Sequence, residues 1–259
     1  MYPWYHGNKK ALSIGCIAQS AVAEIAGVVV SNGERRVTTV LLIRHGMNDW
    51  VHGRLAGWLP GVHLSEEGRR QALALSERLG DLPITALYTS PLDRCIETAR
   101  AIAEPRGLPL RIVEQIGEVR YGEWEGAELK ELYTHELWPG VQHYPSGTRF
   151  PRGETLGEAQ MRMVSAVDQL RARHVGEMIA VVSHADLIRL ALAYYIGVHI
   201  DLFQRLVINP CSLSAIAFEP MGPRLLAYND TGSLDHLRPK PSSPSPTPEA
   251  ASPSSTEAE

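Results

Sequence analysis

The sequence contains few cysteines and no long apolar run. Only Cys16, Cys95 and Cys211 occur in 259 residues, which is too few for a disulfide framework and fits a reducing compartment. None of them has the His or Cys spacing of a zinc site, so we expect no structural metal. No apolar stretch reaches the roughly 18 residues that suggest a membrane-spanning helix. These absences favour a globular protein of the cytoplasm.

Neither sign of charge is in large excess. The formal net charge is -4 at pH 7, so nothing argues for a broad attraction to nucleic acid or to a membrane surface. Apolar residues make up 44% of the chain, which is enough for a full core, and the length allows one or two domains.

The two ends of the chain differ in composition from the middle. In residues 1–36 two lysines precede a small, apolar stretch, and Ala21-Val22-Ala23 resembles a signal-peptidase site, so export is one alternative. Polar residues interrupt that stretch, and we expect residues 1–36 to be poorly ordered, or to precede a true start at Val37. Residues 238–259 are mostly Pro, Ser, Thr, Ala and Glu. They cannot bury enough apolar area to offset their ordering entropy, so we expect a disordered tail.

Residues 37–237 alternate between apolar runs and stretches with helical spacing, which indicates parallel βαβ units. A four-residue connection rich in proline and glycine near the end implies a final antiparallel hairpin. We therefore predict an α/β fold: a three-layer sandwich with a mostly parallel central sheet, helices on both faces and one antiparallel strand near an edge. The predicted strands cover residues 40–43, 84–88, 178–182, 213–218 and 224–228, and the predicted helices cover 65–80, 92–104, 154–173 and 184–196.

Two of the predicted strands end at a histidine. The first leads into Arg44-His45-Gly46, and the strand over 178–182 leads into Ser183-His184. In open α/β sheets the functional site lies at the carboxyl ends of the strands. A histidine there can act as a nucleophile, and the planar guanidinium of an arginine matches phosphate oxygens. One such motif alone is also compatible with a strand followed by a solvated turn, so a functional interpretation depends on the remaining motifs.

Four motifs together resemble the histidine phosphatase (phosphoglycerate mutase-like) superfamily. Each motif alone is a weak signal, but four in the family's order over about 190 residues are specific. They are Arg44-His45-Gly46, Ser90-Pro91-Leu92-Asp93-Arg94-Cys95-Ile96-Glu97-Thr98-Ala99, Glu118 ahead of Gly122-Glu123-Trp124-Glu125-Gly126, and Ser183-His184.

The resemblance implies covalent catalysis without a metal or another cofactor. His45 would be the nucleophile that forms a phosphohistidine, and Arg44, Arg94 and His184 would surround the phosphoryl oxygens. Glu118 would protonate the leaving oxygen and then activate water, which requires a raised pKa. The neighbouring Cys95 is expected to be a packed side chain.

Four positions depart from the pattern that is usual in this family. Met47 and Asn48 stand where an acidic residue followed by Ser or Thr is usual, and Val51 stands where many members carry an asparagine in the phosphate pocket. We expect the amide of Asn48 to substitute for that asparagine. Ala185 follows the second histidine in place of the commoner glycine, so its backbone must approach the phosphate with a methyl group present.

Three functions are compatible with these motifs. We favour a phosphatase for a small phosphorylated metabolite, acting as a monomer or homodimer, over a phosphoglycerate mutase-type phosphomutase, because residues 123–153 do not resemble the longer insertion of the glycolytic mutases. A non-catalytic phosphate-binding module is the third alternative. Residues 121–160, which begin with an irregular aromatic stretch, are interpreted as a lid insertion. Candidate contacts to a second anionic group of the substrate are Arg54, Arg149 and Arg152.

Overall fold

The structure, a computed structural model, describes residues 37–80 and 82–232. The expectations for residues 1–36 and 238–259 lie outside the described residues and stay predictions.

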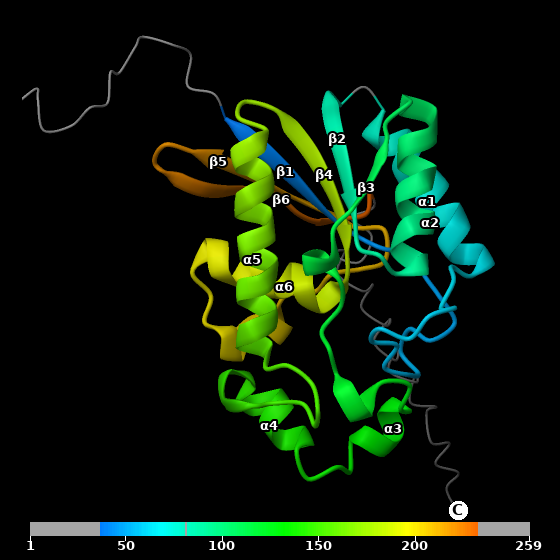
Figure 1. The fold of residues 1–259 in the computed structure, drawn as a ribbon, viewed down its shortest axis with the longest axis vertical. Coiled ribbons are helices and arrows are strands. Elements are labelled where there is room, and N and C mark those ends of the chain that lie inside the picture. The colour runs from blue at the N-terminus through cyan, green and yellow to red at the C-terminus, as the bar shows by residue number, and fades with distance from the viewer. Residues whose placement is uncertain (1–36, 81, 233–259) are drawn as a thin grey trace, which may run out of the picture. The chain divides into compact units, whose positions relative to one another are not determined.

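A six-stranded sheet forms the centre of the described chain, in the order β3-β2-β4-β1-β5-β6 (Figure 1). β1, β2, β3 and β4 are parallel, whereas β5 is antiparallel to both of its neighbours. This confirms the predicted sheet, including the antiparallel strand near an edge. The short β3 was not predicted. The strands are β1 (Thr38–Arg44), β2 (Ile84–Thr89), β3 (Leu110–Ile112), β4 (Met178–Ser183), β5 (Leu213–Glu219) and β6 (Gly222–Asp230).

Helices cover both faces of the sheet, which confirms the three layers (Figure 1). Side chains alternate along a strand, so Leu41 and Ile43 of β1 pack with α1 and α2, while Val40 and Leu42 pack with α5 and α6. Ser65 begins α1 by accepting a hydrogen bond from the backbone of Gly68, as a cap of this kind does. The four helices are α1 (Glu66–Leu79), α2 (Asp93–Ala103), α5 (Leu156–Arg173) and α6 (Ala185–Ile196).

Residues 121–160 contain short helices and an aromatic cluster ahead of the first turns of α5. Trp124 lies with its ring centroid 5.5 Å from Phe150 and stacks at 6.3 Å on Trp138. Whether this segment acts as a lid stays a prediction. The short elements of the described chain are α3 (Leu129–Leu132), α4 (Trp138–His143) and the 3-10 helices Glu104–Arg106, Glu114–Ile116, Gly122–Trp124, Pro145–Gly147 and Ile200–Arg205.

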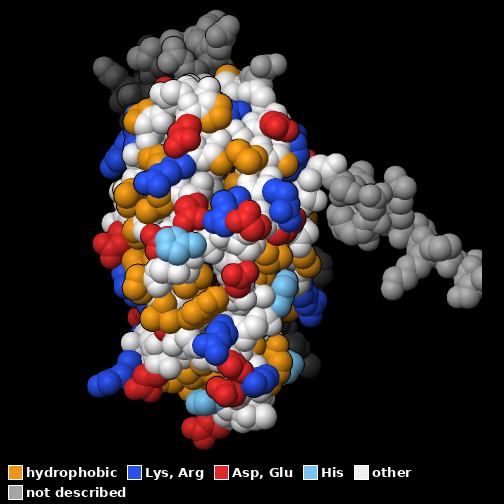
Figure 2. Space-filling view, turned by 90° about the vertical axis from the view of Figure 1, so that its right-hand side faces the viewer, with side chains coloured by type: hydrophobic (Ala, Val, Ile, Leu, Met, Phe, Trp, Pro, Cys, Tyr) orange, Lys and Arg blue, Asp and Glu red, His pale blue; other side chains and the backbone are white. Residues whose placement is uncertain are grey.

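Charged side chains of both signs are interspersed on the face shown in Figure 2. On α1, for example, Arg70 pairs with Glu67 at 2.6 Å. Such exposed pairs contribute little to stability. Within the described residues, no helix has the length and apolar content needed to cross a bilayer.

The carboxyl ends of β1, β2 and β4 meet at one edge of the sheet. Arg44 lies opposite Ser183 in the parallel register, and the backbone N–H of His45 donates to the Ser183 carbonyl at 3.0 Å. From β2, the Ser90 N–H donates to Val182 at 3.0 Å. The chain therefore brings the two predicted histidine motifs and the start of α2 into direct contact.

The loop after β1 passes against the first turn of α1 with almost no space between the two backbones. A Cβ atom added to Gly68 would lie 2.0 Å from the Met47 carbonyl oxygen. A Cβ added to Gly46 would lie 2.7 Å from the carbonyl oxygen of Gly68. Neither neighbour is a side chain that could rotate away, so both positions require glycine.

Replacing Gly68 with alanine is expected to destabilise the fold by roughly 1–3 kcal/mol, the range for overpacking. Gly157→Ala is the matched control, since Gly157 also lies in the first turn of a helix, and its added Cβ would meet only the Thr155 hydroxyl at 3.9 Å. That variant should be neutral or slightly more stable. Urea unfolding of both variants measures the difference, and equal stability would contradict the close contact.

Candidate active site

The predicted site residues converge on a pocket of about 430 Å³ at the carboxyl edge of the sheet. Its lining includes Arg44, His45, Arg94 and Glu118. His184 is fully buried and lies behind this lining, with its ring centroid 5.3 Å from that of His45. The structure thus brings together the five predicted catalytic residues, while their chemical roles stay predictions.

The ring of His45 is held in one orientation. Its Nδ1 lies 2.8 Å from the Gly46 carbonyl oxygen, and because a carbonyl can only accept, Nδ1 carries the proton. Burial, together with the charges of Arg94 and Arg44, holds the pKa of His45 well below its usual value. The imidazole is therefore neutral, and Nε2 has a free lone pair, which is the form that a nucleophile requires.

Helix α2 fixes the loop that carries His45. The hydroxyl of Thr98 accepts a hydrogen bond from the Gly46 N–H at 3.0 Å and donates to the Arg94 carbonyl at 2.8 Å. Arg94 in turn donates from Nη2 to the carbonyl of Gly57 at 2.9 Å. The second predicted motif therefore supplies a cation and also ties two loops around the pocket.

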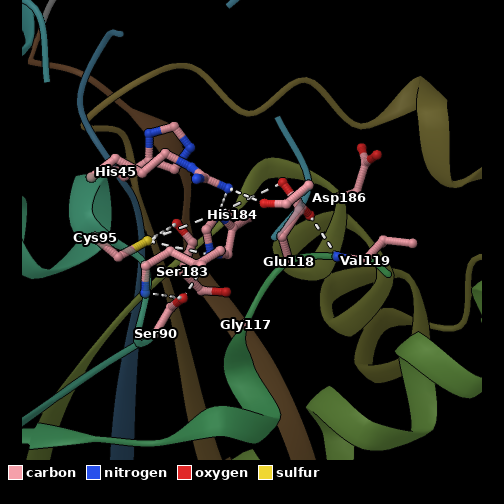
Figure 3. A network of polar contacts seen from close by, with 12 residues as sticks. His45, Ser90, Cys95, Gly117, Glu118, Val119, Ser183, His184 and Asp186 are labelled. Carbon is pink, nitrogen blue, oxygen red and sulfur yellow. Dashed lines mark hydrogen bonds and ion pairs between the residues drawn. The ribbon is translucent and has the colours of Figure 1, made fainter. Parts of the chain in front are cut away.

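His184 is also neutral. Its Nδ1 lies 3.2 Å from Nη2 of Arg94. A guanidinium can only donate, so Nδ1 is the acceptor and Nε2–H faces the Ser90 hydroxyl at 2.8 Å (Figure 3). Burial first, and then Arg94, lower the pKa of His184 well below its usual value. A phosphoryl group would oppose this shift, because a nearby negative charge favours imidazolium.

Two arginine donors beside the pocket have no partner among residues 37–80 and 82–232. Arg44 donates from Nη1 to the carbonyl of Ile208 at 2.7 Å, but its Nε is buried and unpaired. Arg94, which is 1% exposed, has an unpaired Nη1. Buried donors are normally satisfied, so two unsatisfied ones next to a neutral imidazole indicate a site that an anion completes.

Glu118 has the raised pKa that the acid role requires. Its side chain is 12% exposed, and burial, with the charge of Asp186 as the second cause, raises its pKa to about 7. Oε2 lies 3.6 Å from Nδ1 of His184 and Oε1 accepts from the Val119 N–H at 3.0 Å (Figure 3). A carboxyl with this pKa can hold a proton at neutral pH and also release it.

The backbone at Glu118 is clamped from two sides. Trp58 donates from its indole N–H to the Glu118 carbonyl at 2.6 Å, and Arg162 of α5 donates to the same oxygen at 3.1 Å. Arg162 also reaches the Gly117 carbonyl at 2.9 Å and pairs with Glu154 at 2.6 Å. The carboxyl of Glu118 is therefore placed by a loop and a helix that are far from it in sequence.

The other predicted substrate contacts differ in placement. Asn48 is buried in the lining and accepts through Oδ1 from the Trp50 N–H at 3.0 Å, which leaves its NH₂ group to donate. Ala185 lines the pocket as the first residue of α6. Arg54 also belongs to the lining and pairs with Glu128 at 3.0 Å. Arg149 and Arg152, by contrast, lie outside the pocket lining.

Four residues in contact with the site were not singled out for it in the sequence. Ser90 faces His184, while Asp186 accepts from the Tyr121 hydroxyl at 2.8 Å and pairs with Arg189 at 2.9 Å. Ser90 opens the second motif and Asp186 follows His184 by two residues, so the motif positions themselves were the available signal. Tyr121 and Arg189 gave no comparable signal.

Cys95 is packed beneath the site, as predicted. It is fully buried, with Sγ 3.4 Å from Nε2 of His184, and burial raises the pKa of its thiol to about 12. In residues 37–80 and 82–232, no group of three His, Cys, Asp or Glu side chains is arranged to hold a metal ion.

The sequence of this chain is similar to those of known phosphatases and mutases. The chain fits the histidine phosphatase superfamily (branch 1) over residues 40–231. It is 31% identical over 199 residues to phosphoserine phosphatase 1 of Hydrogenobacter thermophilus, covering 75% of this chain and 93% of that protein. It is 29% identical over 182 residues to the probable phosphoglycerate mutase GpmB of Photorhabdus laumondii, covering 70% of this chain and 85% of that protein.

Solved structures agree with the sequence relatives. The fold matches YhfR of Bacillus stearothermophilus with a TM-score of 0.71 and 28% identity, over 74% of this chain and 97% of that one. The match over residues 40–231 extends from β1 to the end of β6 and includes all four motifs. The chain belongs to the histidine phosphatase superfamily.

Proposed function

We propose that the protein is a phosphatase that hydrolyses a small phosphomonoester through a phosphohistidine on His45. The observation that carries this proposal is the neutral His45 beside the unpaired donors of Arg44 and Arg94, with a protonatable Glu118 in the same pocket. The name of the H. thermophilus relative, phosphoserine phosphatase 1, supports the same reaction class. Within the described residues Cys95 and Cys211 are free and buried thiols, which supports a reducing location that we propose to be the cytoplasm.

In the first step the phosphoryl group passes from the ester to His45. Nε2 attacks phosphorus while the bond from phosphorus to the ester oxygen breaks. Arg44 and Arg94 hold the equatorial oxygens, which is mainly positioning and electrostatic stabilisation. The departing oxygen takes the proton of Glu118 and leaves as an alcohol. Bringing the phosphoryl dianion close to His184 raises the pKa of that imidazole, so His184 becomes a further donor.

In the second step water attacks the phosphohistidine. Glu118, now a carboxylate, accepts a proton from the water as its oxygen bonds to phosphorus, and the bond to Nε2 breaks. Inorganic phosphate leaves, His45 regains its neutral form with the proton on Nδ1, and Glu118 is again protonated. We propose that the NH₂ group of Asn48 and the backbone at Ala185 line the phosphate during both steps, and that Arg54 acts further out at the pocket.

The alternative is a phosphomutase, which returns the phosphoryl group to an acceptor instead of to water. The name of the P. laumondii relative, probable phosphoglycerate mutase GpmB, favours keeping this alternative. Both reactions share the first step. They differ in the product formed from 3-phosphoglycerate with a 2,3-bisphosphoglycerate primer, which is 2-phosphoglycerate for a mutase and inorganic phosphate for a phosphatase.

Replacing His45 with alanine is expected to abolish hydrolysis of p-nitrophenyl phosphate, since it removes the ring nitrogen that is proposed to attack phosphorus. A phosphohistidine is labile in acid. Wild type that is incubated with a ³²P-labelled phosphate ester and quenched in alkali should therefore retain the label, and His45→Ala should not. His63→Ala is the control, because His63 is an exposed histidine paired with Glu97 outside the pocket. Turnover that survives in His45→Ala would rule out the covalent mechanism.

Replacing Glu118 with glutamine should slow poor leaving groups more than good ones. The amide is isosteric but has no acidic proton to give, and general acid catalysis of this kind contributes about 10²–10⁴-fold. We expect a loss of that size in kcat/KM for an alkyl phosphate and a much smaller loss for p-nitrophenyl phosphate. Glu123→Gln, an exposed position, is the control. Equal slowing of both esters would remove Glu118 from the acid role.

Replacing Asp186 with asparagine should move the alkaline limit of activity to lower pH. The proposed acid is active while protonated, so kcat/KM for an alkyl phosphate should fall as pH rises through the Glu118 pKa of about 7. The charge of Asp186 raises that pKa, and its removal should lower the limit by roughly half a unit to one unit.

Asp168→Asn is the matched control for this shift. Asp168 also accepts from a tyrosine hydroxyl, that of Tyr195, and pairs with an arginine three residues later, Arg171, but it lies outside the pocket lining. Using one ester for all variants keeps the ionisation of the substrate constant. An unchanged alkaline limit in Asp186→Asn would show that Glu118 does not set it.

A further inference from the structure

The pocket is divided into a charged end and an apolar end. Arg44, His45, Arg94 and Glu118 line the charged end, where the phosphoryl group is proposed to bind. Much of the remaining lining comes from the segment between the start of α3 and the start of α5 and from the 3-10 helix Ile200–Arg205. Its apolar walls are formed chiefly by Trp124, Leu129, Trp138, Val141, Phe150 and Phe203, and uncharged polar groups are added by Tyr133, Gln142 and Gln204.

The apolar walls are tightly packed side chains. Trp124 and Phe203 are 4% and 1% exposed, and Trp124 is fixed between the rings of Phe150 and Trp138. An apolar group placed against these rings would lose contact with water without requiring the walls to move. A preformed apolar wall favours ligands of the same polarity.

The cations of the lining that have no carboxylate partner lie at the charged end. Of the four arginines, Arg189 pairs with Asp186 at 2.9 Å. Arg54 is half exposed and pairs at 3.0 Å with Glu128, a carboxylate that Lys130 also contacts at 2.6 Å. Arg44 and Arg94 form no ion pair within the described residues, and both adjoin His45. A second anionic group packed against the buried apolar walls would therefore meet no unpaired, buried arginine there among the described residues, and it would lose its water at a cost.

We infer that the leaving group of the natural substrate is uncharged and largely apolar, and that it packs against Trp124, Leu129 and Trp138. This inference rests on the proposed phosphatase function, because it names the alcohol from which the phosphoryl group is removed. It distinguishes this chain from a phosphatase that acts on the phosphate ester of an amino acid or a hydroxy acid, in which the leaving group is charged.

The test is calorimetric binding of phosphonates, which the enzyme cannot hydrolyse. Affinity should rise from ethyl- to butyl- to hexylphosphonate by about fourfold for each buried methylene. 6-Phosphonohexanoate, which adds a terminal carboxylate to a chain of similar length, should bind at least about tenfold more weakly than hexylphosphonate. A flat series, equal or tighter binding of the carboxylate, or no binding of any phosphonate would overturn the inference.

A pair of variants locates the effect. Leu129→Asn places an amide in the apolar wall and should reduce the ratio of hexyl to ethyl affinity by severalfold. Leu226→Asn makes the same exchange at a 56% exposed position of β6 outside the lining and should keep the wild-type ratio. Equal ratios in both variants would overturn the assignment of Leu129. Since no turnover is involved, tight hexylphosphonate binding without hydrolysis of hexyl phosphate would reject the phosphatase function alone.

Discussion

The burial of two guanidinium groups beside two imidazoles is the constraint on which the rest of the site depends. Arg94 is 1% exposed, and removing such a charge from water is expensive unless hydrogen bonds or an opposite charge replace the water. The protein supplies carbonyl oxygens from Gly57 and Ile208, which offset part of that penalty. Among the described residues, Nε of Arg44 and Nη1 of Arg94 have no partner, so the pocket favours a ligand with acceptor oxygens, such as a phosphoryl dianion.

The same two cations determine the protonation of their neighbours. They reinforce burial in lowering the pKa of His45 and of His184, which favours the unprotonated form of His45, the proposed nucleophile. For Glu118 they act in the opposite direction to burial and to Asp186, which prevail and raise its pKa. One cluster thus holds a neutral imidazole and a protonatable carboxyl in the same pocket, which is the division of roles that the proposed transfer to His45 needs.

The parts of the fold that follow strong local rules could be predicted from the sequence. Apolar runs of four or five residues specified β1, β2 and β4, and Ser65 specified the start of α1. β3 was missed because it has only three residues, of which Leu110 is partly buried while Arg111 and Ile112 are exposed. The short helices of the segment 121–160 have too few turns to show a period.

The candidate site was predictable only as far as its motifs extend. Ser90, Tyr121 and Asp186 act through pairings over 65 residues or more, and spacing along the chain contains no record of such pairings. The orientation of the Asn48 amide, by contrast, is set by a local turn, in which its Oδ1 accepts from the Trp50 N–H. The polarity of the far end of the pocket depends on which side chains of several separate segments face inward, and only the fold determines that.

The polarity of the pocket also bears on the choice between a phosphatase and a phosphomutase. A mutase that works through a bisphosphorylated intermediate must hold a second dianion while the first is transferred. Within the described residues, the two lining arginines without an ion pair adjoin His45, and Arg189 pairs with Asp186. The exposed Arg54 shares Glu128 with Lys130. If Arg189 bound a second phosphate, Asp186 would lose its ion-pair partner. The charge of Asp186 is one of the causes that raise the pKa of Glu118, the proposed acid. A second phosphate would therefore disturb the acid that the reaction needs, whereas water requires no further cation, and the arrangement favours hydrolysis.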